Sequence, residues 1–138
     1  MPIEQTEGVG HFAIRVRDIE RSKKFYGETL GFPLIREQKR EDDTVVNFMA
    51  HGMMFGIRGN HAKTGSDDEF DPFRVGLDHF ALHVADAATL PRLVEQLDEA
   101  GVRHNGIHKE ESGVEYICFY DPDGIPWELF AVPAQAGR

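Results

Sequence analysis

Residues 8–18 read GVGHFAIRVRD, and most of this stretch recurs as GLDHFALHVAD at residues 76–86. Aligned without a gap, the two segments are identical at six of eleven positions, including a shared His-Phe-Ala triplet. A repeat of this kind within 138 residues predicts two copies of one supersecondary unit. Each copy carries a histidine at the same point, His11 in the first and His79 in the second.

The first copy begins with side chains that alternate between two faces, which predicts a β-strand over residues 9–16. One face carries Phe12, Ile14 and Val16, and the other carries His11, Ala13 and Arg15. We expect the apolar face to be covered and the histidine face to open onto a polar space.

Helical spacing follows this strand. Asp18 is a suitable N-cap, apolar residues then recur every three or four positions, and Gly31 suits a left-handed C-terminal stop. Three further strands are expected within residues 32–37, 42–50 and 53–59. The order βαβββ is therefore predicted for the module of residues 8–59.

The same order recurs in the second half of the chain. Its predicted elements are a strand at residues 76–84, a helix from near Thr89 to Gly101, and strands at residues 102–107, 115–121 and 126–132. These elements make a second module of residues 76–133, in which Asp-Pro-Asp-Gly at residues 121–124 predicts a turn. Residues 60–75 are polar and aperiodic, and we expect them to link the modules within a single domain of residues 1–138.

The composition limits the classes of partner. A formal net charge of −9 and the lack of a basic stripe disfavour a nucleic acid or an anionic membrane. No apolar run reaches the ~18 residues that a membrane span needs, and the N-terminus has no signal-peptide core. Cys118 is the single cysteine and cannot form an internal disulfide, which fits a reducing compartment. We therefore expect a cytoplasmic protein.

Glu128 lies in an otherwise apolar predicted strand, where a carboxylate is costly unless its face is wet or it meets a cation. Two modules related by a pseudo-twofold would bring His11 and His79 together on one concave surface, within reach of Glu128. Each histidine alone is more often a structural residue, but the duplication in register together with Glu128 favours ligands. Two imidazoles and a carboxylate that leave coordination positions open form the facial triad of non-haem Fe(II) sites. We therefore predict a divalent metal held by these three residues.

At these positions the chain resembles the vicinal oxygen chelate superfamily, which holds glyoxalase I, extradiol dioxygenases, fosfomycin-resistance transferases and bleomycin-resistance proteins. The resemblance covers roughly residues 8–133. Its motifs are the paired His-Phe-Ala segments, Phe25-Tyr26 followed by Leu30-Gly31-Phe32, and DPDGIPWELF at residues 121–130. It implies an α+β fold in which two tandem βαβββ modules form an eight-stranded, cup-like, half-open barrel. It also implies a homodimer that binds a small molecule.

The resemblance assigns the family's metal ligands to His11, His79 and Glu128. The fourth ligand typical of glyoxalase I falls on Gly56, which has no side chain. Three protein ligands are therefore implied, with one divalent metal per site: Fe²⁺ or Mn²⁺ first, and Zn²⁺, Ni²⁺ or Co²⁺ as alternatives. Dioxygenases and fosfomycin transferases tend to place a tyrosine where this chain has Cys118.

Other candidate site residues follow from strand alternation and from the resemblance. Tyr116 and Tyr120 share a strand face with Cys118 and are candidates for the missing tyrosine, and His108 is a candidate acid or base whose alternative is an exposed loop histidine. Candidate substrate-binding residues are Arg15, Asn47, Arg58, His83 and Cys118. The two arginines are expected either to hold an anionic group or to be solvated charges at strand ends.

Three classes of function remain open. The first is a metal-dependent enzyme acting on a small vicinal-oxygen substrate, dioxygenase-like, with a glyoxalase-type isomerase or lyase and a fosfomycin-type thiol transferase as alternatives. The second is a non-catalytic protein that binds a small molecule such as an antibiotic, and the third is an accessory dimerisation or sensory module. The sequence also leaves open whether His11 joins His79 and Glu128 of its own chain or of a partner.

Overall fold

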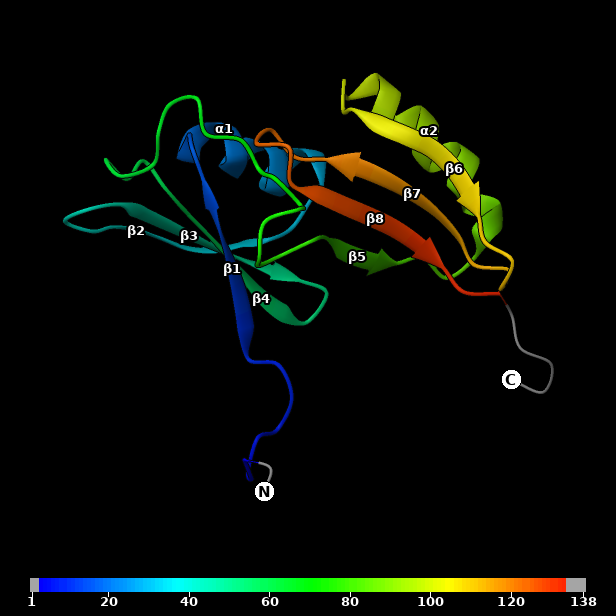
Figure 1. Cartoon of the computed structure of the whole chain (residues 1–138), viewed down its shortest axis with the longest axis horizontal. Coiled ribbons are helices and arrows are strands. Elements are labelled where there is room, and N and C mark those ends of the chain that lie inside the picture. Colours follow the sequence, from blue (N-terminus) through cyan, green and yellow to red (C-terminus); the bar gives the residue numbers. More distant parts are fainter. Residues whose placement is uncertain (1–2, 134–138) are drawn as a thin grey trace. The chain divides into compact units, whose positions relative to one another are not determined.

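The computed structural model describes residues 3–133, whose eight strands form two four-stranded sheets (Figure 1). The chain divides into two compact units, unit 1 (Met1–Asp68) and unit 2 (Glu69–Arg138), and the boundary lies inside the predicted linker. Each unit has a strand, a helical segment and three further strands. The predicted α+β fold of two tandem βαβββ modules is confirmed.

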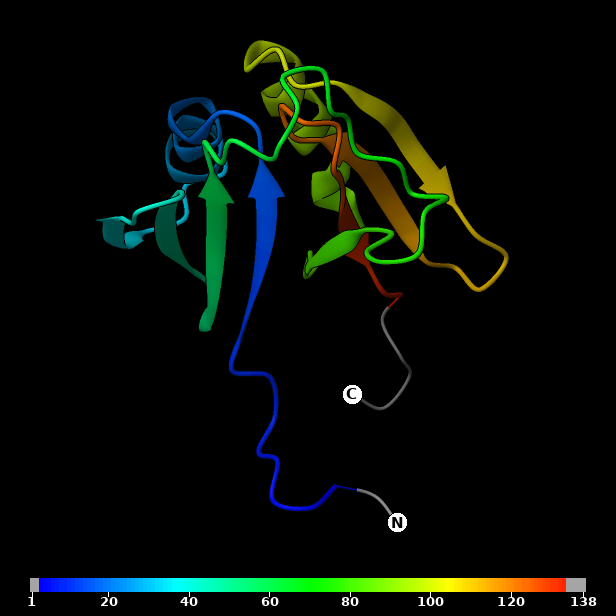
Figure 2. The same ribbon diagram turned by 60° about the vertical axis from the view of Figure 1, so that its left-hand side comes forward.

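The sheet of unit 1 has the strand order β1-β4-β3-β2. Its elements are β1 (His11–Val16), α1 (Ile19–Lys24), the π-helix η1 (Phe25–Thr29), β2 (Leu34–Lys39), β3 (Thr44–Ala50) and β4 (Met53–Gly59). β1 runs parallel to β4, as Figure 2 shows, whereas the other pairs are antiparallel. The β1–β4 register places Ala13 opposite Gly56.

Burial in β1 follows the predicted alternation. Ile14 and Val16 are buried, whereas His11 and Arg15 are exposed. The apolar face is covered by the helical segment, where the ring of Tyr26 meets that of Phe55 edge-on at a centroid distance of 4.8 Å. The histidine face of β1 therefore stays accessible within unit 1.

The first helix begins as expected but is not uniform. The carboxylate of Asp18 accepts hydrogen bonds from the backbone N–H groups of Glu20 and Arg21. The chain then widens into a π-helix, in which the N–H of Leu30 donates to the carbonyl of Phe25 at 2.9 Å. The helical segment predicted between Asp18 and Gly31 is therefore present, with a π-helical second part that the spacing did not predict, and Gly31 has a positive φ of 75°.

The sheet of unit 2 has the order β5-β8-β7-β6. Its elements are β5 (Phe80–His83), the 3-10 helix η2 (Ala87–Thr89), α2 (Leu90–Glu99), β6 (His104–Lys109), β7 (Glu115–Tyr120) and β8 (Pro126–Ala131). Helix α2 lies along β6 and β7 (Figure 1). Leu90 and Leu97 of this helix and Ile117, Phe119 and Trp127 of the sheet are buried. The opposite face of the sheet carries Glu128.

Strand β5 is shorter than predicted, so His79 directly precedes it instead of lying within it. The N–H of Val84 donates to the carbonyl of Phe130, so the backbone groups of Phe130 face β5. Every second residue of β8 does the same, and the backbone of Pro126 therefore also faces β5. Proline has no N–H to donate, so the ladder cannot extend toward residue 78. In unit 1 the residue that corresponds to Pro126 is Met54, which has an N–H, and strand β1 includes His11.

The turns before the last strand of each unit correspond. Gly52 and Gly124 have φ values of 86° and 83°, a left-handed conformation that glycine adopts without strain. In unit 2 the Asp121 carboxylate also accepts from the N–H groups of Asp123 and Ile125. The predicted turn at residues 121–124 is confirmed. Counted from these two glycines, Gly56 of β4 corresponds to Glu128 of β8, and each pairs with the alanine of a His-Phe-Ala triplet.

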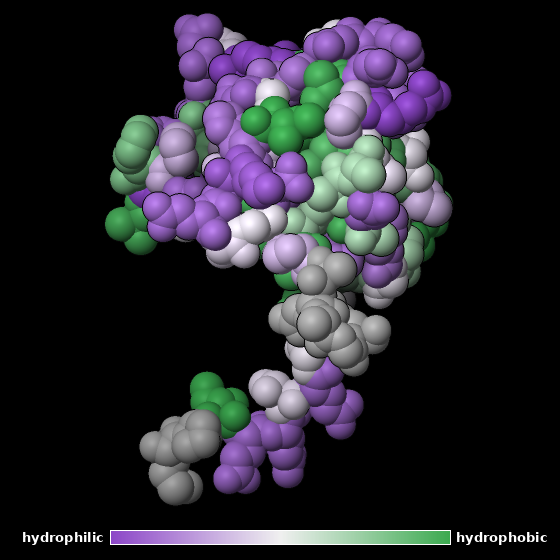
Figure 3. Space-filling view, turned by 90° about the vertical axis from the view of Figure 1, so that its right-hand side faces the viewer, coloured by the Kyte–Doolittle hydropathy of each residue, from purple (hydrophilic) through white to green (hydrophobic). Residues whose placement is uncertain are grey.

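The surface is mixed in character. On the face shown in Figure 3, hydrophobic residues lie between larger areas of hydrophilic ones. Among residues 3–133, no helix is long and apolar enough to cross a membrane. Two apolar side chains at the start of unit 2, Phe73 and Val75, are almost fully exposed.

Candidate metal centre

Two of the three predicted ligands lie close together in unit 2. Ala81 of β5 pairs with Glu128 of β8, and His79, two residues before Ala81, shares its face of the sheet. The Nε2 of His79 lies 3.5 Å from the Oε1 of Glu128, and the two side chains are 42% and 18% exposed. An imidazole nitrogen and a carboxylate oxygen are therefore presented together at an accessible edge.

The other ring nitrogen of His79 is held by a carboxylate. Its Nδ1 lies 2.6 Å from the Oδ1 of Asp78, and because a carboxylate can only accept, Nδ1 carries the hydrogen. In the neutral imidazole the lone pair is then on Nε2, on the side of Glu128. Metal-binding histidines commonly donate their second N–H to a carboxylate, which fixes the tautomer and the ring orientation.

The donor atoms suit a divalent ion. Two ligand atoms, each about 2.1 Å from one ion at a tetrahedral angle, are about 3.4 Å apart. The 3.5 Å between His79 and Glu128 agrees with that spacing. Neutral imidazole with carboxylate is a donor set that Zn²⁺, Fe²⁺, Mn²⁺, Ni²⁺ and Co²⁺ accept.

The third predicted ligand, His11, belongs to unit 1, where it is the first residue of β1 and is exposed. Within residues 3–133, no group of three or more His, Cys, Asp or Glu side chains is arranged to hold an ion. The structure therefore gives a two-residue half-site in unit 2, and the triad with His11 stays a prediction.

Gly56, the counterpart of Glu128, lies against Asn47 of β3. A Cβ at position 56 would come within 2.9 Å of the Asn47 Oδ1 and 3.5 Å of the Ala13 Cβ. Asn47 thus fills the space that a side chain at position 56 would need. This packing gives a physical reason why unit 1 has no fourth ligand at this position.

Cys118 is the cross-strand neighbour of Glu128 and lies beside Tyr120. Burial raises the pKa of its thiol, while a hydrogen bond with Tyr120 acts in the opposite direction. That same hydrogen bond is the main cause that raises the pKa of Tyr120, whose hydroxyl also accepts from the Nδ2 of Asn105 at 2.7 Å. The Arg103 guanidinium lies 3.9 Å from the centre of the tyrosine ring. The Tyr120 hydroxyl is therefore well positioned on the face of Glu128.

Three other predicted site residues of unit 2, Tyr116, His108 and His83, lie on the same face of the sheet as Glu128. The His108 ring stacks on Tyr116 at a centroid distance of 5.6 Å, and its Nε2 lies 3.0 Å from the Asn105 carbonyl oxygen. Since a carbonyl accepts, that nitrogen is a donor in a local contact of β6. His83 is exposed at the end of β5.

Arg15 and Arg58 already have an anionic partner in unit 1. Both donate to the Oδ2 of Asp43, Arg15 through Nη1 at 2.8 Å and Arg58 through Nε at 3.2 Å. The hydrogen bond from Arg15, followed by that from Arg58, lowers the pKa of this buried carboxyl, while burial acts to raise it. The two arginine side chains thus pair with a carboxylate of their own unit and remain 43% and 39% exposed. Both arginines line a hollow of about 270 Å³, together with Arg40, His61 and the acidic residues 41–43.

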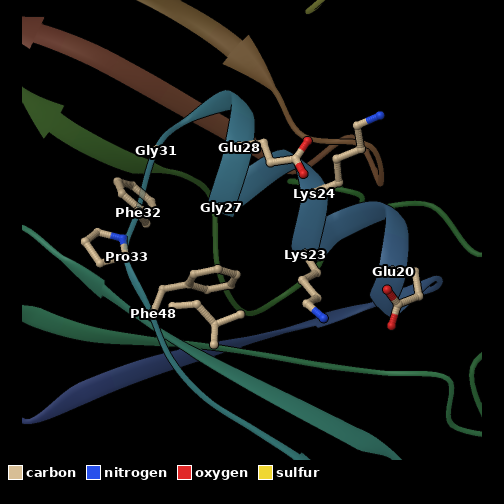
Figure 4. Close-up of a pocket in the computed structure, with 10 residues that line it drawn as sticks. Glu20, Lys23, Lys24, Gly27, Glu28, Gly31, Phe32, Pro33 and Phe48 are labelled. Carbon is tan, nitrogen blue, oxygen red and sulfur yellow. The ribbon is translucent and has the colours of Figure 1, made fainter.

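A larger hollow, of about 510 Å³, lies between the first helical segment and β2 (Figure 4). Charged residues of α1 such as Glu20 and Lys23 line one side, and Phe48, Phe32 and Pro33 line the other. None of the expected site residues borders it. We assign it no part in the candidate metal centre.

Two carboxylates that contact predicted site residues, Asp78 and Asp43, were not predicted from the sequence. Asp78 directly precedes His79, whereas Gly10 precedes His11. This difference between the two copies is the sequence feature that could have indicated a carboxylate partner for His79. Asp43 lies in a run of three acidic residues, 41–43, that reads as a solvated turn. Only the fold shows that it meets two arginines from other strands.

Known proteins resemble this chain over most of its length. It is 28% identical over 131 residues to the uncharacterized protein YwkD of Bacillus subtilis, covering 90% of this chain and 96% of YwkD. It is 31% identical over 126 residues to the probable lactoylglutathione lyase, chloroplastic, of Arabidopsis thaliana, covering 86% of this chain but only 34% of that protein. The chain thus spans about a third of the plant relative.

A solved structure agrees with these matches. The glyoxylase/bleomycin resistance protein/dioxygenase domain from Frankia sp. EAN1pec superposes with a TM-score of 0.82 at 26% identity, covering 94% of this chain and all of that chain. The family model matches residues 8–129. The chain belongs to the glyoxalase/bleomycin resistance protein/dioxygenase superfamily.

Proposed function

We propose that this chain is a divalent-metal-dependent enzyme acting on a small substrate with two adjacent oxygen atoms. The observation that carries the proposal is the sequence of contacts from Asp78 through His79 to Glu128, which orients two ligands toward one point. His11 would complete the ligand set.

The ligand set leaves coordination positions for substrate oxygens, because three protein side chains do not fill the shell of these ions. When bound, the metal supplies Lewis-acid polarisation of a substrate oxygen and a template for two neighbouring oxygens. Fe²⁺ and Mn²⁺ are our first candidates, and Zn²⁺, Ni²⁺ and Co²⁺ are alternatives. The expected location is the cytoplasm.

Among reaction classes we favour proton transfer of the isomerase or lyase type over the dioxygenase type expected from the sequence. The His108 proposed as a dioxygenase acid or base is stacked on Tyr116 and donates to a backbone carbonyl, so its Nε2 is already engaged. The plant relative is named a probable lactoylglutathione lyase, which supports the same preference. A thiol transferase remains the next alternative.

The substrate side of the site is assigned to residues on the Glu128 face. Tyr120 supplies a hydroxyl that Asn105 and Cys118 hold in place, and it is our candidate for orienting a substrate oxygen or moving its proton. Tyr116, Cys118 and His83 line the same face in unit 2. From unit 1, Asn47, Arg15 and Arg58 are assigned to substrate binding, with the free N–H groups of the two arginines available to an anionic substituent.

We further propose that the active form is a homodimer. Phe73 and Val75, which are 95% and 109% exposed, lie before β5 and offer apolar surface of the kind that a second copy covers. A dimer would allow His11 of one chain to join His79 and Glu128 of the other. Mixing a His11→Ala chain with a Glu128→Ala chain separates the two arrangements. With shared sites, each heterodimer regains metal binding at one of its two sites, whereas with intrachain sites it regains none.

The test of the function is metal titration followed by an activity screen. Protein stripped with a chelator is titrated with Fe²⁺, Mn²⁺, Zn²⁺, Ni²⁺ and Co²⁺, and each loaded form is assayed on hemithioacetals, catechols and epoxides. We expect one ion per site and turnover of hemithioacetals before catechols. Failure to bind any of the five ions would contradict the enzyme proposal and would favour a binding protein that needs no metal.

A further inference from the structure

We infer that Asn105 is a site of self-deamidation, promoted by the side chains of Asp98 and His104. Asn105 and Gly106 form the one Asn-Gly dipeptide of the sequence. The modification requires no cofactor and does not depend on the proposed function, because all of the groups involved lie in α2, β6 and β7 of unit 2.

The dipeptide lies in an irregular part of the sheet. The pairing of β6 with β7 changes register between His104 and Ile107, so Asn105 and Gly106 form a bulge. Asn105 is exposed, and Gly106 has a φ of 76°. The backbone nitrogen of a glycine carries no neighbouring Cβ that would hinder its approach to the asparagine side chain.

A basic nitrogen faces that backbone nitrogen. The N–H of Gly106 donates to the Nδ1 of His104 at 3.1 Å, so Nδ1 presents a lone pair and the ring hydrogen is on Nε2. That Nε2 lies 2.7 Å from the Oδ1 of Asp98 on α2. The His104 side chain is only 14% exposed, which limits its movement.

The order carboxylate, imidazole and N–H matches the arrangement in which a carboxylate orients a histidine as the general base for a nucleophile. The Gly106 nitrogen attacks Cγ of Asn105 and gives its proton to His104 Nδ1. The Cγ–Nδ2 bond breaks, and the amide leaves as ammonia after taking up that proton. Water then opens the five-membered imide and leaves aspartate or isoaspartate at position 105, with no change of oxidation state.

The change would alter the candidate active site. Asn105 Nδ2 now donates to the Tyr120 hydroxyl and lowers the pKa of that group. Loss of the donor and its replacement by a carboxylate would remove this effect and add a negative charge on the Glu128 face. The expected result is a further rise in the pKa of Tyr120 in aged protein.

The test follows residue 105 by peptide mass spectrometry in the full folded chain, without metal, at pH 7.4 and 37 °C. We expect a gain of about 1 Da and isoaspartate at this position. Formation should be at least about 100-fold slower in His104→Gln, the low end of what a positioned base contributes. Asp98→Asn should slow it less. In urea-unfolded chains, wild type and His104→Gln should react at similar rates.

His61→Gln is the matched control, because its Nδ1 accepts from the N–H of Lys63 in the same way but no asparagine lies between them. This variant should leave the rate at Asn105 unchanged. An intact Asn105 in the folded wild type, or equal folded-state rates in wild type and His104→Gln, overturns the inference. Circular dichroism of each variant verifies that the comparison is between folded chains.

Discussion

The Nε2 of His79 and the Oε1 of Glu128 face each other at 3.5 Å across the β5–β8 pair. In unit 1 the corresponding pair of strands carries His11 and Gly56, so the copies differ in the residue that faces the histidine. The two units therefore have similar strand pairs, but at these corresponding positions unit 2 has an imidazole and a carboxylate, whereas unit 1 has an imidazole and a glycine. The proposed metal binding is testable one residue at a time.

Removing the carboxylate behind His79 should weaken metal binding. We expect Asp78→Ala to lower affinity by about 10- to 100-fold, because the ring loses the partner that fixes its tautomer. Asp78→Asn should have a smaller effect, since its amide oxygen still accepts from Nδ1. Isothermal titration with Zn²⁺ measures both, and Asp68→Ala, which removes one exposed charge elsewhere, is the control. Equal affinities in all four proteins would exclude this role for Asp78.

The packing of Asn47 against Gly56 should appear as non-additive stability. Gly56→Ala places a methyl group 2.9 Å from the Asn47 Oδ1, so the end of that side chain must move, and we expect a cost of about 1 kcal/mol, the low end for overpacking. In an Asn47→Ala background the same change should cost much less, because the space is then free. Urea denaturation of the four proteins gives the coupling. Gly10→Ala, where a Cβ meets nothing within 4 Å, should be nearly neutral.

Asp43 should make stability depend on acid pH. The hydrogen bonds from Arg15 and Arg58 lower the pKa of Asp43 in the folded chain below the usual 3.8. Its contribution to the free energy of unfolding is therefore complete above pH 3.8 and is lost as the pH falls through the folded pKa. Asp43→Asn should therefore unfold at a lower temperature than wild type at pH 7, and the gap should shrink below about pH 3.8. Thermal melts from pH 2.5 to 7 test this. The exposed neighbour Asp42 provides the control variant, Asp42→Asn, and a gap that is constant with pH would contradict the prediction.

Cys118 should react slowly with thiol reagents. Burial raises the pKa of its thiol, so less thiolate is present at neutral pH than for an ordinary cysteine. Tyr120→Phe removes the hydrogen bond that lowers this pKa and should slow alkylation further. Iodoacetamide labelling with a chelator present gives a clean rate, because the chain has a single cysteine. If Cys118 were alkylated faster than glutathione under the same conditions, its surroundings would activate the thiol and the prediction would be wrong.

The sequence predicted the fold well because its signals were local and repeated. Alternation in β1, the cap at Asp18 and the turn at residues 121–124 each depend on a few neighbouring residues. The truncation of β5 was missed because its cause, Pro126, lies on a partner strand about fifty residues away. Pairing across a sheet is a tertiary property that periodicity does not contain.

The candidate site was predicted less completely for the same reason. His79 and Glu128 were expected to meet, and they do so within unit 2. The roles of the other polar residues depend on partners remote in sequence, as when Asp43 meets Arg15 and Arg58 from β1 and β4. Neither arginine carries a local signal for that partner.

The most direct measurement is the metal content of Glu128→Gln beside wild type. Both proteins are stripped, loaded with Zn²⁺ or Mn²⁺, dialysed and analysed for bound metal per chain, with Glu111→Gln as a control that removes an exposed carboxylate from the same unit. The account predicts a stoichiometric ion in wild type and Glu111→Gln and loss of tight binding in Glu128→Gln, with the fold retained by circular dichroism. Equal metal content in Glu128→Gln and wild type would contradict it.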